Sequence, residues 1–468
     1  MQVGDIFTDE SFDVVTASVE VDRVEIDSRA CEFPTLFFAV AGRTHDGANF
    51  VTDAIAHGAV AIVSPRPLTA AVPVIVIPEA RIHEALAHAS ATVSGHPEVG
   101  LDLVGVTGTN GKTTVTTLVA ELARSLAWNG AMIGTLTNER TTPAAPELYR
   151  TLARVRSSFN AGRTRSVVAM EVSSHALDQH RVVGTQFAVV AFTNLSHDHL
   201  DYHRTMEAYF AAKARLFTPE YSSRAVVWVD DPYGQHLARY TNLAVAPVSR
   251  EDASDISSTL AGTIFFWRGH LVNTPLIGDY NIDNSLMAMT IMSELGADDG
   301  LIAAAMAGVA AVPGRFEVVH HADVTVIVDY AHTPEGLARL LRSVRELSAG
   351  RVLTVFGCGG DRDATKRPAM GKVASELSDV TIVTSDNPRH ESPDAIIDAI
   401  IAGAVASADV EREVDRRTAI ARALERATSG DVVVVAGKGH ETTQTFADRV
   451  VAFDDREVVT ELVKGSSC

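Results

Sequence analysis

The residues with the clearest chemical potential lie in the segment TGTNGKTT at residues 107–114. An apolar run over Leu103–Val106 enters this glycine-rich turn, and Lys112 with the two threonines after it opens a helical stretch. Such a junction directs backbone N–H groups and a helix N-terminus at an anion, while the lysine reaches the outer phosphates and a hydroxyl can bind Mg²⁺. The general loop pattern has glycine five residues before Gly111, where this sequence has Val106, so the segment is a narrower form of a phosphate-binding loop. A glycine turn with no ligand is less favoured, because Gly-Lys-Thr-Thr stands at the junction.

Acidic and histidine residues follow two later apolar runs. Glu171 comes directly after Ser166–Met170, and the segment NLSHDHLDYH at 194–203 follows Phe187–Phe192. Because ligand sites in parallel sheets lie at the carboxyl ends of the strands, these side chains are expected near the phosphate loop. Carboxylate and imidazole groups beside phosphates favour Mg²⁺, with a threonine hydroxyl after Lys112 as a further ligand, whereas zinc is allowed by the HxHxD spacing but less favoured there. The candidates, several of which are expected to be structural, are Glu171, His197, Asp198, His199, Asp201 and His203.

Composition limits the class of protein. A chain of 468 residues with 46% hydrophobic content can form two to four domains, each with its own core. The formal net charge of −19 argues against non-specific nucleic-acid binding. No apolar run approaches the length of a membrane span, and the acidic start MQVGDIFTDESFD is unlike a signal peptide. Three cysteines without metal-like spacing fit a reducing compartment, so we expect a cytoplasmic protein with no membrane insertion.

The positions of the apolar runs predict an α/β fold of three segments. Short β-type runs alternate with helical stretches, such as the one around Phe50–His57, and continuous apolar runs are typical of buried parallel strands. A Pro-Gly-Arg sequence at 313–315 precedes the third segment. The expected strands are Thr35–Val40, Ala59–Val63, Val74–Ile77, Leu103–Val106, Ser166–Met170, Phe187–Phe192, Ala225–Val229, Val324–Val328, Val352–Phe356, Val380–Thr384 and Asp431–Val435.

A set of motifs in a fixed order resembles one enzyme family. The motifs TGTNGKTT, EVSSHAL, NLSHDHLDYH, YFAAKARLF, GDYNIDN, PGRFE, DYAHTPEGL and GKGHE are similar to those of the Mur ligases of peptidoglycan synthesis. The resemblance extends from Asp27 to Glu441. It implies a small N-terminal UDP-sugar-binding α/β module over 1–98, a central P-loop ATPase-type parallel-sheet domain over 99–316, and a C-terminal Rossmann-like amino-acid-binding domain over 317–468.

The resemblance also implies a reaction. ATP phosphorylates a substrate carboxylate to an acyl phosphate, an amine attacks it, and ADP and phosphate are released, because phosphorylation turns a carboxylate oxygen into a good leaving group. The motifs are most similar to those of members that add the third peptide residue, here meso-diaminopimelate, to UDP-N-acetylmuramoyl-L-alanyl-D-glutamate. Alternatives are the same ligation with L-lysine or another amino acid, a folylpolyglutamate synthase-type substrate, or a catalytically silent nucleotide-binding paralog. We expect a monomer with small-molecule substrates and no nucleic-acid partner.

On the ATP side, the resemblance assigns catalytic roles to Lys112, Glu171, His199 and Lys213. The last three, with Thr113, are the implied Mg²⁺ ligands, and Lys213 matches the family's carbamylated lysine; on the residues alone it reads as a solvated helix lysine. The implied nucleotide contacts are Gly108, Thr109, Asn110, Gly111, Lys112, Thr113, Thr114, Asn281, Asn284, Arg315 and Asp329. Taken alone, the Asn-x-x-Asn pair could equally cap a helix or bond within the core, and Arg315 could be a surface residue on a hinge.

On the substrate side, the resemblance divides the contacts between the domains. DNPR at 386–389 is similar to the signature of enzymes that select diaminopimelate, in which Arg389 would bind the distal carboxylate and Glu441 the distal ammonium. An ordinary Asn-Pro turn is the alternative reading. The segment GTLTNER at 134–140 is shorter than usual in the family. The implied substrate contacts are Ser28, Arg43, Thr44, His45, Thr141, Thr142, Ser173, Arg181, Arg362, Asp386, Asn387, Pro388, Arg389, Gly437 and Glu441.

Overall fold

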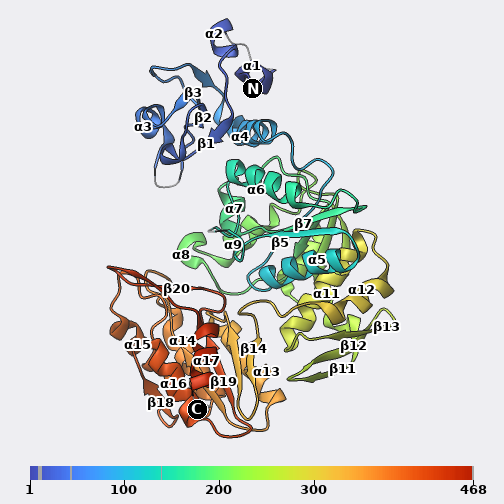
Figure 1. The fold of residues 1–468 in the computed structure, drawn as a ribbon, viewed down its shortest axis with the longest axis vertical. Helices are drawn as coiled ribbons and strands as arrows, with labels where there is room; N and C mark the ends of the chain where they lie inside the picture. Colours follow the sequence, from blue (N-terminus) through green and yellow to red (C-terminus); the bar gives the residue numbers. More distant parts are fainter. Residues whose placement is uncertain (9–12, 43–44, 139, 466–468) are drawn as a thin grey trace.

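Most strands of the protein gather into three mainly parallel sheets that follow one another along the chain, as seen in a computed structural model (Figure 1). The structure describes residues 1–8, 13–42, 45–138 and 140–465. It confirms the predicted α/β class with three domains. The domain limits 1–98, 99–316 and 317–468 stay a prediction.

The N-terminal domain is built on a sheet with the strand order β1-β2-β3-β4, in which every pairing is parallel. Leu36 and Phe38, on the same side of β2, are completely buried in its core. Its last helix, α4, packs against both β1 and α6 of the next domain. Its elements are α1 (Val3–Ile6), α2 (Val14–Ala17), β1 (Arg23–Glu25), η1 (Ser28–Ala30), β2 (Thr35–Phe38), η2 (Gly47–Phe50), α3 (Val51–Ala56), β3 (Ala59–Ser64), β4 (Val74–Val76) and α4 (Glu79–Val93).

The central domain has a parallel sheet with the order β10-β9-β8-β5-β7-β6. Strand β5 has β7 on one side and β8 on the other, and both pair with it in parallel. The loops after these three strands therefore meet at a topological switch point, where open α/β sheets bind ligands. Helices α5 and α11 cover one face. The elements are β5 (Asp102–Thr107), α5 (Lys112–Ser125), β6 (Asn129–Ile133), α6 (Ala145–Ser158), β7 (Ser166–Glu171), α7 (Ser174–Asp178), β8 (Val189–Phe192), α8 (Leu200–His203), α9 (Met206–Ala214), β9 (Arg224–Trp228), α10 (Pro232–Tyr240), β10 (Ala244–Val248), η3 (Arg250–Asp252), β11 (Ala253–Thr259), β12 (Gly262–Trp267), β13 (His270–Thr274), α11 (Asp279–Glu294), α12 (Asp299–Ala305) and η4 (Met306–Gly308).

The C-terminal domain has the strand order β14-β15-β19-β16-β17-β18, parallel except for the edge strand β14. Its central strand β19 is an all-buried run of four valines and an alanine. Helices α13, α14 and α15 cover one face, and α16 and α17 the other. The elements are β14 (Glu317–His321), β15 (Thr325–Asp329), α13 (Pro334–Leu347), β16 (Val352–Phe356), α14 (Lys366–Leu377), β17 (Val380–Val383), α15 (Pro393–Ile401), β18 (Val410–Arg412), α16 (Arg416–Arg426), β19 (Val432–Ala436), β20 (Thr443–Thr445), β21 (Val450–Ala452) and α17 (Asp455–Gly465).

Every strand that the apolar runs predict is present, with ends that differ by one or two residues. The exposed or half-polar strands were not predicted. The antiparallel sheet β11–β13 is an example, because its strands alternate buried and exposed residues instead of forming one apolar run. Within the described ranges, none of the helices is both long and apolar enough to cross a membrane.

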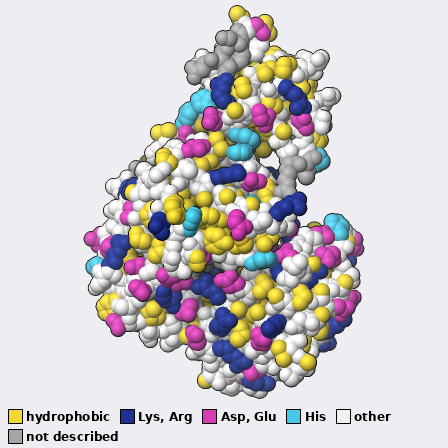
Figure 2. Space-filling view, turned by 180° about the vertical axis from the view of Figure 1, so that it is seen from behind, with side chains coloured by type: hydrophobic (Ala, Val, Ile, Leu, Met, Phe, Trp, Pro, Cys, Tyr) yellow, Lys and Arg dark blue, Asp and Glu magenta, His cyan; other side chains and the backbone are white. Residues whose placement is uncertain are grey.

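Polar contacts join the N-terminal domain to the central domain, although the N-terminal domain forms a separate lobe at the top of Figure 1. Arg150 of α6 donates to the carboxylate of Glu25 at 2.8 Å and to the carbonyl of Val24 at 3.2 Å. The rings of His83 and His180 stack with their centroids 4.8 Å apart. On the face in Figure 2, acidic, basic and apolar side chains are interspersed.

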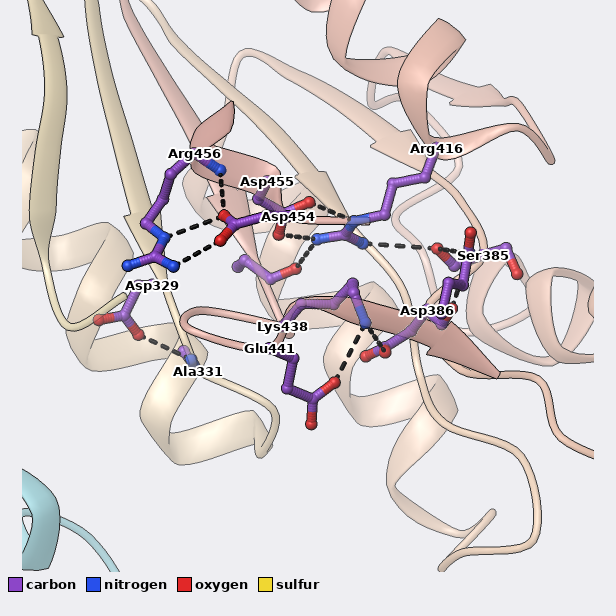
Figure 3. A network of polar contacts seen from close by, with 12 residues as sticks. Asp329, Ala331, Ser385, Asp386, Arg416, Lys438, Glu441, Asp454, Asp455 and Arg456 are labelled. Atoms are coloured by element: carbon purple, nitrogen blue, oxygen red, sulfur yellow. Dashed lines mark hydrogen bonds and ion pairs between the residues drawn. The ribbon is translucent and has the colours of Figure 1, made fainter. Parts of the chain in front are cut away.

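A buried ion pair ties two helices of the C-terminal domain to its central strand. The side chains of Arg416 and Asp455 are fully buried and form two hydrogen bonds of 2.8 Å (Figure 3). Arg416 also donates to the carbonyl oxygen of Ala436, at the end of β19, at 2.9 Å. Both α16 and α17 begin at this pair, so it fixes their start against the sheet.

We expect Arg416→Met to lower the free energy of unfolding by about 3–5 kcal/mol, because it leaves the Asp455 carboxylate buried without a partner. Calorimetry and urea denaturation measure the loss. The double variant Arg416→Met/Asp455→Leu should recover much of it, and Arg417→Met, which removes an exposed ion pair with Glu461, should cost less than about 1 kcal/mol. Equal losses in the single and double variants would contradict this explanation.

Candidate active site

The backbone of the phosphate-loop segment contacts the side chain of Lys112, which lies in the same segment. Gly111 has φ 86°, and a Cβ there would lie 2.4 Å from Oδ1 of Asn284, so the loop requires glycine at this position. Lys112, the first residue of α5, donates from Nζ to the carbonyl oxygens of Gly108 at 2.9 Å and Thr109 at 2.8 Å. Several backbone groups of the loop and the start of α5 thus face one cleft.

A second lysine reaches the same loop from α9. Lys213 is 1% exposed, and its Nζ donates to the carbonyl oxygen of Gly108 at 2.7 Å. The ring of Tyr209 lies 4.5 Å from this Nζ. Burial, assisted by the neighbouring Lys112, lowers the pKa of Lys213 well below its usual value, and burial also lowers the pKa of Lys112. In the described part of the chain neither lysine forms an ion pair, although Asp198 attracts both lysines and Glu171 attracts Lys112 from farther away.

A buried carboxylate and a hydroxyl lie on the other side of the loop. Glu171, at the end of β7, accepts hydrogen bonds from the Thr113 hydroxyl at 3.0 Å and the Thr135 N–H at 2.9 Å. Arg315, in the linker between the central and C-terminal domains, donates to the Thr113 hydroxyl at 3.3 Å. The linker therefore brings a third cationic group to the loop.

The oxygen atoms of Glu171 and Thr113 fit a hard cation such as Mg²⁺, which prefers oxygen ligands and retains several waters. Over the ranges that the structure describes, no group of three or more His, Cys, Asp or Glu side chains could hold a metal ion.

The histidines after β8 divide into cleft residues and structural residues. His199 lines the cleft, its Nε2 lies 3.4 Å from Asp198, and its ring meets that of His175 edge-on at 4.9 Å. The surrounding protein desolvates His199 and lowers its pKa, which favours the neutral imidazole. His203 is buried and its Nε2 hydrogen-bonds to Ser174 at 2.9 Å, so it has a structural role. The remaining candidates, His197 and Asp201, are exposed and do not line the cleft.

A second cavity, of about 100 Å³, lies between the phosphate loop and the C-terminal domain. Asn284 and Asp329 line it, together with Trp228, which the sequence analysis did not single out. Asn281 lies behind it, because its amide donates to the Ile277 carbonyl at 2.8 Å and accepts from Asn284 at 3.3 Å. Thr114, Asn110 and Gly111 also face this cavity.

Asp329 is a structural anchor as well as a cavity residue. Its carboxylate accepts hydrogen bonds from the N–H groups of Phe316 and Ala331, both at 2.7 Å, and from the Tyr280 hydroxyl at 3.2 Å. Burial raises its pKa. Because Phe316 follows Arg315 directly, Asp329 holds the linker in place beside the cavity.

The predicted sugar-peptide contacts of the central domain lie in the same cleft as the phosphate loop. Thr141, Thr142, Ser173 and Arg181 all line it, and so does Arg140, which was not predicted. The Thr142 hydroxyl donates to the Glu171 carbonyl at 2.9 Å, and Arg181 donates to the Thr142 carbonyl at 2.9 Å. Position 139, within the short segment at 134–140, lies outside the described residues.

The predicted contacts of the N-terminal domain lie apart from this cleft. Ser28 is buried and donates to the Asp53 carboxylate at 2.5 Å. The ring of His45 meets that of Phe50 at 5.9 Å. The other two predicted residues, Arg43 and Thr44, lie outside the described residues.

The predicted amino-acid contacts gather at the carboxyl edge of the C-terminal sheet. Asn387 donates from Nδ2 to Glu441 at 2.7 Å, and Arg389 donates to the Gly360 carbonyl at 2.8 Å. Asp386 and Pro388 belong to the same loop after β17, and Gly437 follows β19. Arg362 is exposed in the loop after β16. Sequence reasoning missed Lys438, which is fully buried among these residues, although it lies inside the GKGHE motif.

The linker also contacts the loop after β19. A Cβ on Gly314 would lie 2.2 Å from backbone atoms of Gly439 and His440, so the two segments are in direct backbone contact. The ring of Tyr330 lies beside this contact, 4.3 Å from the Arg315 guanidinium and 5.3 Å from the His440 ring. The cluster after β19 and the phosphate-loop cleft are thus connected through the linker.

Comparisons with known proteins agree along the chain. Family models described as "Mur ligase family, catalytic domain", "Mur ligase middle domain" and "Mur ligase, glutamate ligase domain" match residues 20–94, 106–292 and 314–439. The UDP-N-acetylmuramoyl-L-alanyl-D-glutamate–2,6-diaminopimelate ligase of Gloeobacter violaceus is 44% identical in an alignment 466 residues long, which covers 95% of this chain and 94% of that protein. A solved structure of a ligase with the same name has a TM-score of 0.70 at 30% identity, covering 100% of this chain and 99% of that one. A MurF ligase from Thermotoga maritima, solved with ADP, shares the fold with a TM-score of 0.64 at 19% identity and covers 95% and 97%.

We expect Gly111→Ala to raise the Kd for ADP about 10- to 100-fold, because a strained left-handed residue costs about 1–3 kcal/mol and 1.4 kcal/mol is a factor of ten. Isothermal titration calorimetry measures the change. Gly308→Ala is the matched control, since a Cβ there meets no atom within 4 Å. Unchanged ADP affinity in Gly111→Ala would show that the loop does not bind nucleotide through this turn.

Proposed function

Because this chain belongs to the Mur ligase family, we propose that it is an ATP-dependent ligase that adds meso-diaminopimelate to UDP-N-acetylmuramoyl-L-alanyl-D-glutamate. The observation that carries the proposal is the shared cleft of the phosphate loop. Lys112, Lys213, Glu171 and the linker residue Arg315 all face it, and the substrate-contact candidates around Thr142 line the same cleft. A phosphoryl donor and a carboxylate acceptor can therefore meet there.

The first chemical step is transfer of the γ-phosphoryl group of ATP to the carboxylate of the substrate's D-glutamate. The bond from the γ-phosphorus to the β–γ bridging oxygen breaks, a carboxylate oxygen forms the new bond to phosphorus, and ADP leaves. Lys112 and Arg315 would stabilise the charge that spreads over the transferring phosphoryl group, since both are cationic and lie at the phosphate loop. When bound at Glu171, Thr113 and His199, Mg²⁺ would supply further neutralisation of the phosphates.

The second step forms the amide. The amine of the incoming amino acid attacks the acyl carbon, the tetrahedral intermediate expels inorganic phosphate, and the amine loses a proton. The C-terminal cluster around Asn387, Arg389 and Glu441 would hold the amino acid. Arg389 is half-buried, and one N–H of its guanidinium donates to the Gly360 carbonyl oxygen. The other N–H groups of the guanidinium can bind a carboxylate.

Lys213 would act as a carbamate in this reaction. Its neutral amine would bond to the carbon of CO₂ and release a proton. The side chain would then end in an anionic carbamate. Complete burial beside Lys112 and without a carboxylate partner in the described structure supports this assignment, because burial favours the neutral amine. The carbamate would then lie in the same cleft as Glu171 and Thr113, the residues that would bind Mg²⁺.

A cytoplasmic location and a monomeric state belong to the same proposal. The reaction consumes ATP and a nucleotide-linked sugar. The described cysteines, Cys31 and Cys358, are buried and unpaired, which fits a reducing compartment. Size-exclusion chromatography with light scattering tests the monomer, and a dimer would contradict it.

A coupled assay for phosphate release tests the function. Release should require ATP, the UDP-sugar dipeptide and diaminopimelate together, and mass spectrometry should find the UDP-sugar tripeptide. Equal turnover with L-lysine would contradict the amino-acid specificity. Binding of the UDP-sugar without any ADP formation would instead favour a silent paralog.

We expect Lys213→Ala to lower kcat by about 10²–10³-fold, an effect of the size seen when one group that stabilises transition-state charge is lost. Added bicarbonate should raise the activity of the protein with its natural sequence when that protein has been prepared without CO₂. Lys372→Ala is the control, since this lysine is exposed and pairs only with Glu376. If neither the substitution nor bicarbonate changes the rate, Lys213 is not carbamylated in the reaction.

Arg389→Ala should raise the KM for diaminopimelate about 10- to 100-fold, because the distal carboxylate loses a charge-assisted partner worth about 1.5–3 kcal/mol. The KM for ATP should change less than about twofold. Steady-state kinetics with each substrate varied measures both, with Arg417→Ala as the control. A parallel rise of the two KM values would assign Arg389 to another role.

A further inference from the structure

Lys438 is the most deeply buried charge in the C-terminal cluster. It is 0% exposed and lies in the loop after β19 (Figure 3). Its Nζ donates to the Thr443 carbonyl at 2.7 Å, to Oε2 of Glu441 at 3.1 Å and to Oδ1 of Asn387 at 3.4 Å. The carboxylate of Asp386 lies 3.9 Å away. A buried ammonium with this number of partners is fixed in position.

This ammonium determines the orientation of the Asn387 amide. Oδ1 of Asn387 accepts from Lys438 and from the N–H of Thr445 at 2.9 Å. An ammonium and a backbone N–H can only donate, so the amide oxygen must face them. The NH₂ group of Asn387 is then directed at Glu441, to which it donates at 2.7 Å.

The same contacts orient the carboxylate of Glu441. Its Oε2 accepts from both Lys438 and Asn387. In the described residues no hydrogen bond is made to Oε1, and the Glu441 side chain is 32% exposed. One oxygen is thus held by the protein, and the other is available at the surface of the cluster for a donor from outside.

Lys438 and the two carboxylates beside it together carry one negative charge. Lys438 lies between two carboxylates, Asp386 at 3.9 Å and Glu441 at 3.1 Å, and therefore offsets one of them. The remaining charge matches a single ammonium group. Without Lys438, two carboxylates would compete for the same cation and Glu441 would lose its fixed orientation.

The scaffold behind the cluster is rigid. Arg416 donates to the carbonyls of Ser385 and Ala436, which end the segments that lead to Asp386 and Lys438. Gln444 donates to the Asp386 carbonyl at 2.7 Å. The positions of the two loops are therefore set independently of a ligand.

We propose that Lys438 is a positioning residue for selectivity: it aligns Glu441 and Asn387 so that the cluster prefers an amino acid with a distal ammonium group. This inference rests on the proposed ligase function. A polar site that is fixed to receive an N–H donor rejects an analogue without it, because the carboxylate oxygen is left unpaired. Lys438 itself need not touch the substrate.

The test compares two amino acids that differ only in the distal amine: meso-diaminopimelate and 2-aminopimelate, which retains the distal carboxylate. The unmodified enzyme should prefer diaminopimelate in kcat/KM by about 10²–10⁴-fold. In Lys438→Met this ratio should fall to about tenfold or less, while the KM for ATP stays within about twofold. Lys372→Met, at an exposed position, should retain the full ratio.

Thermal unfolding shows whether each variant folds. If Lys438→Met does not fold, Lys438→Gln, which has no charge and only two N–H donors for the three partners, should lower the ratio in the same direction. An unchanged ratio, or a parallel rise in the KM for ATP, overturns the proposal. Failure of both variants to fold also overturns it, because the residue is then structural. An unmodified enzyme that uses neither amino acid contradicts the ligase function itself, and the positioning role with it.

Discussion

The carbonyl oxygen of Gly108 accepts hydrogen bonds from two lysines, and the arrangement of the site follows from the charge that this creates. Lys112 and Lys213 donate to it at 2.9 and 2.7 Å. Two ammonium groups so close together repel each other, and burial strengthens the repulsion. The carboxylates of Glu171 and Asp198 offset this repulsion only in part, because burial still lowers the pKa of both lysines. The cleft is therefore poised for external anions, and a lysine whose pKa is lowered is open to chemical conversion.

The position of β5 in the sheet explains why so many groups meet at that carbonyl. Its neighbours β7 and β8 end in Glu171 and in the segment with His199, while the chain after β8 leads to α9 and Lys213. Arg315 reaches the cleft through the linker that Asp329 anchors, and Tyr330 and His332 of the C-terminal domain line the same cleft. A site divided between a rigid sheet edge and a linker can be complete only when the C-terminal domain is in place.

The sequence predicted the parts of this architecture that depend on continuous burial. Most strands of the parallel sheets are continuous apolar runs in the sequence, so they could be predicted. The polar residues directly after these runs could then be predicted as site residues. The strands β11–β13 were missed because half of their residues face solvent. Side-chain direction was also beyond reach: Asn281 and Asn284 look alike in the motif, yet only Asn284 faces the cavity, since Asn281 bonds to Ile277. Lys438 was not singled out because burial of a lysine depends on partners that are distant in the sequence.

The backbone contact between Gly314 and Gly439 has a mechanical consequence. No side chain separates the linker from the loop after β19, and a single added methyl group would overlap it. Any swing of the C-terminal domain about the linker must therefore break or slide this contact, which joins the segment carrying Arg315 to the one carrying Lys438. Loosening one segment displaces the other. A movement that withdraws Arg315 from the phosphate loop would therefore also disturb the loop that carries Lys438.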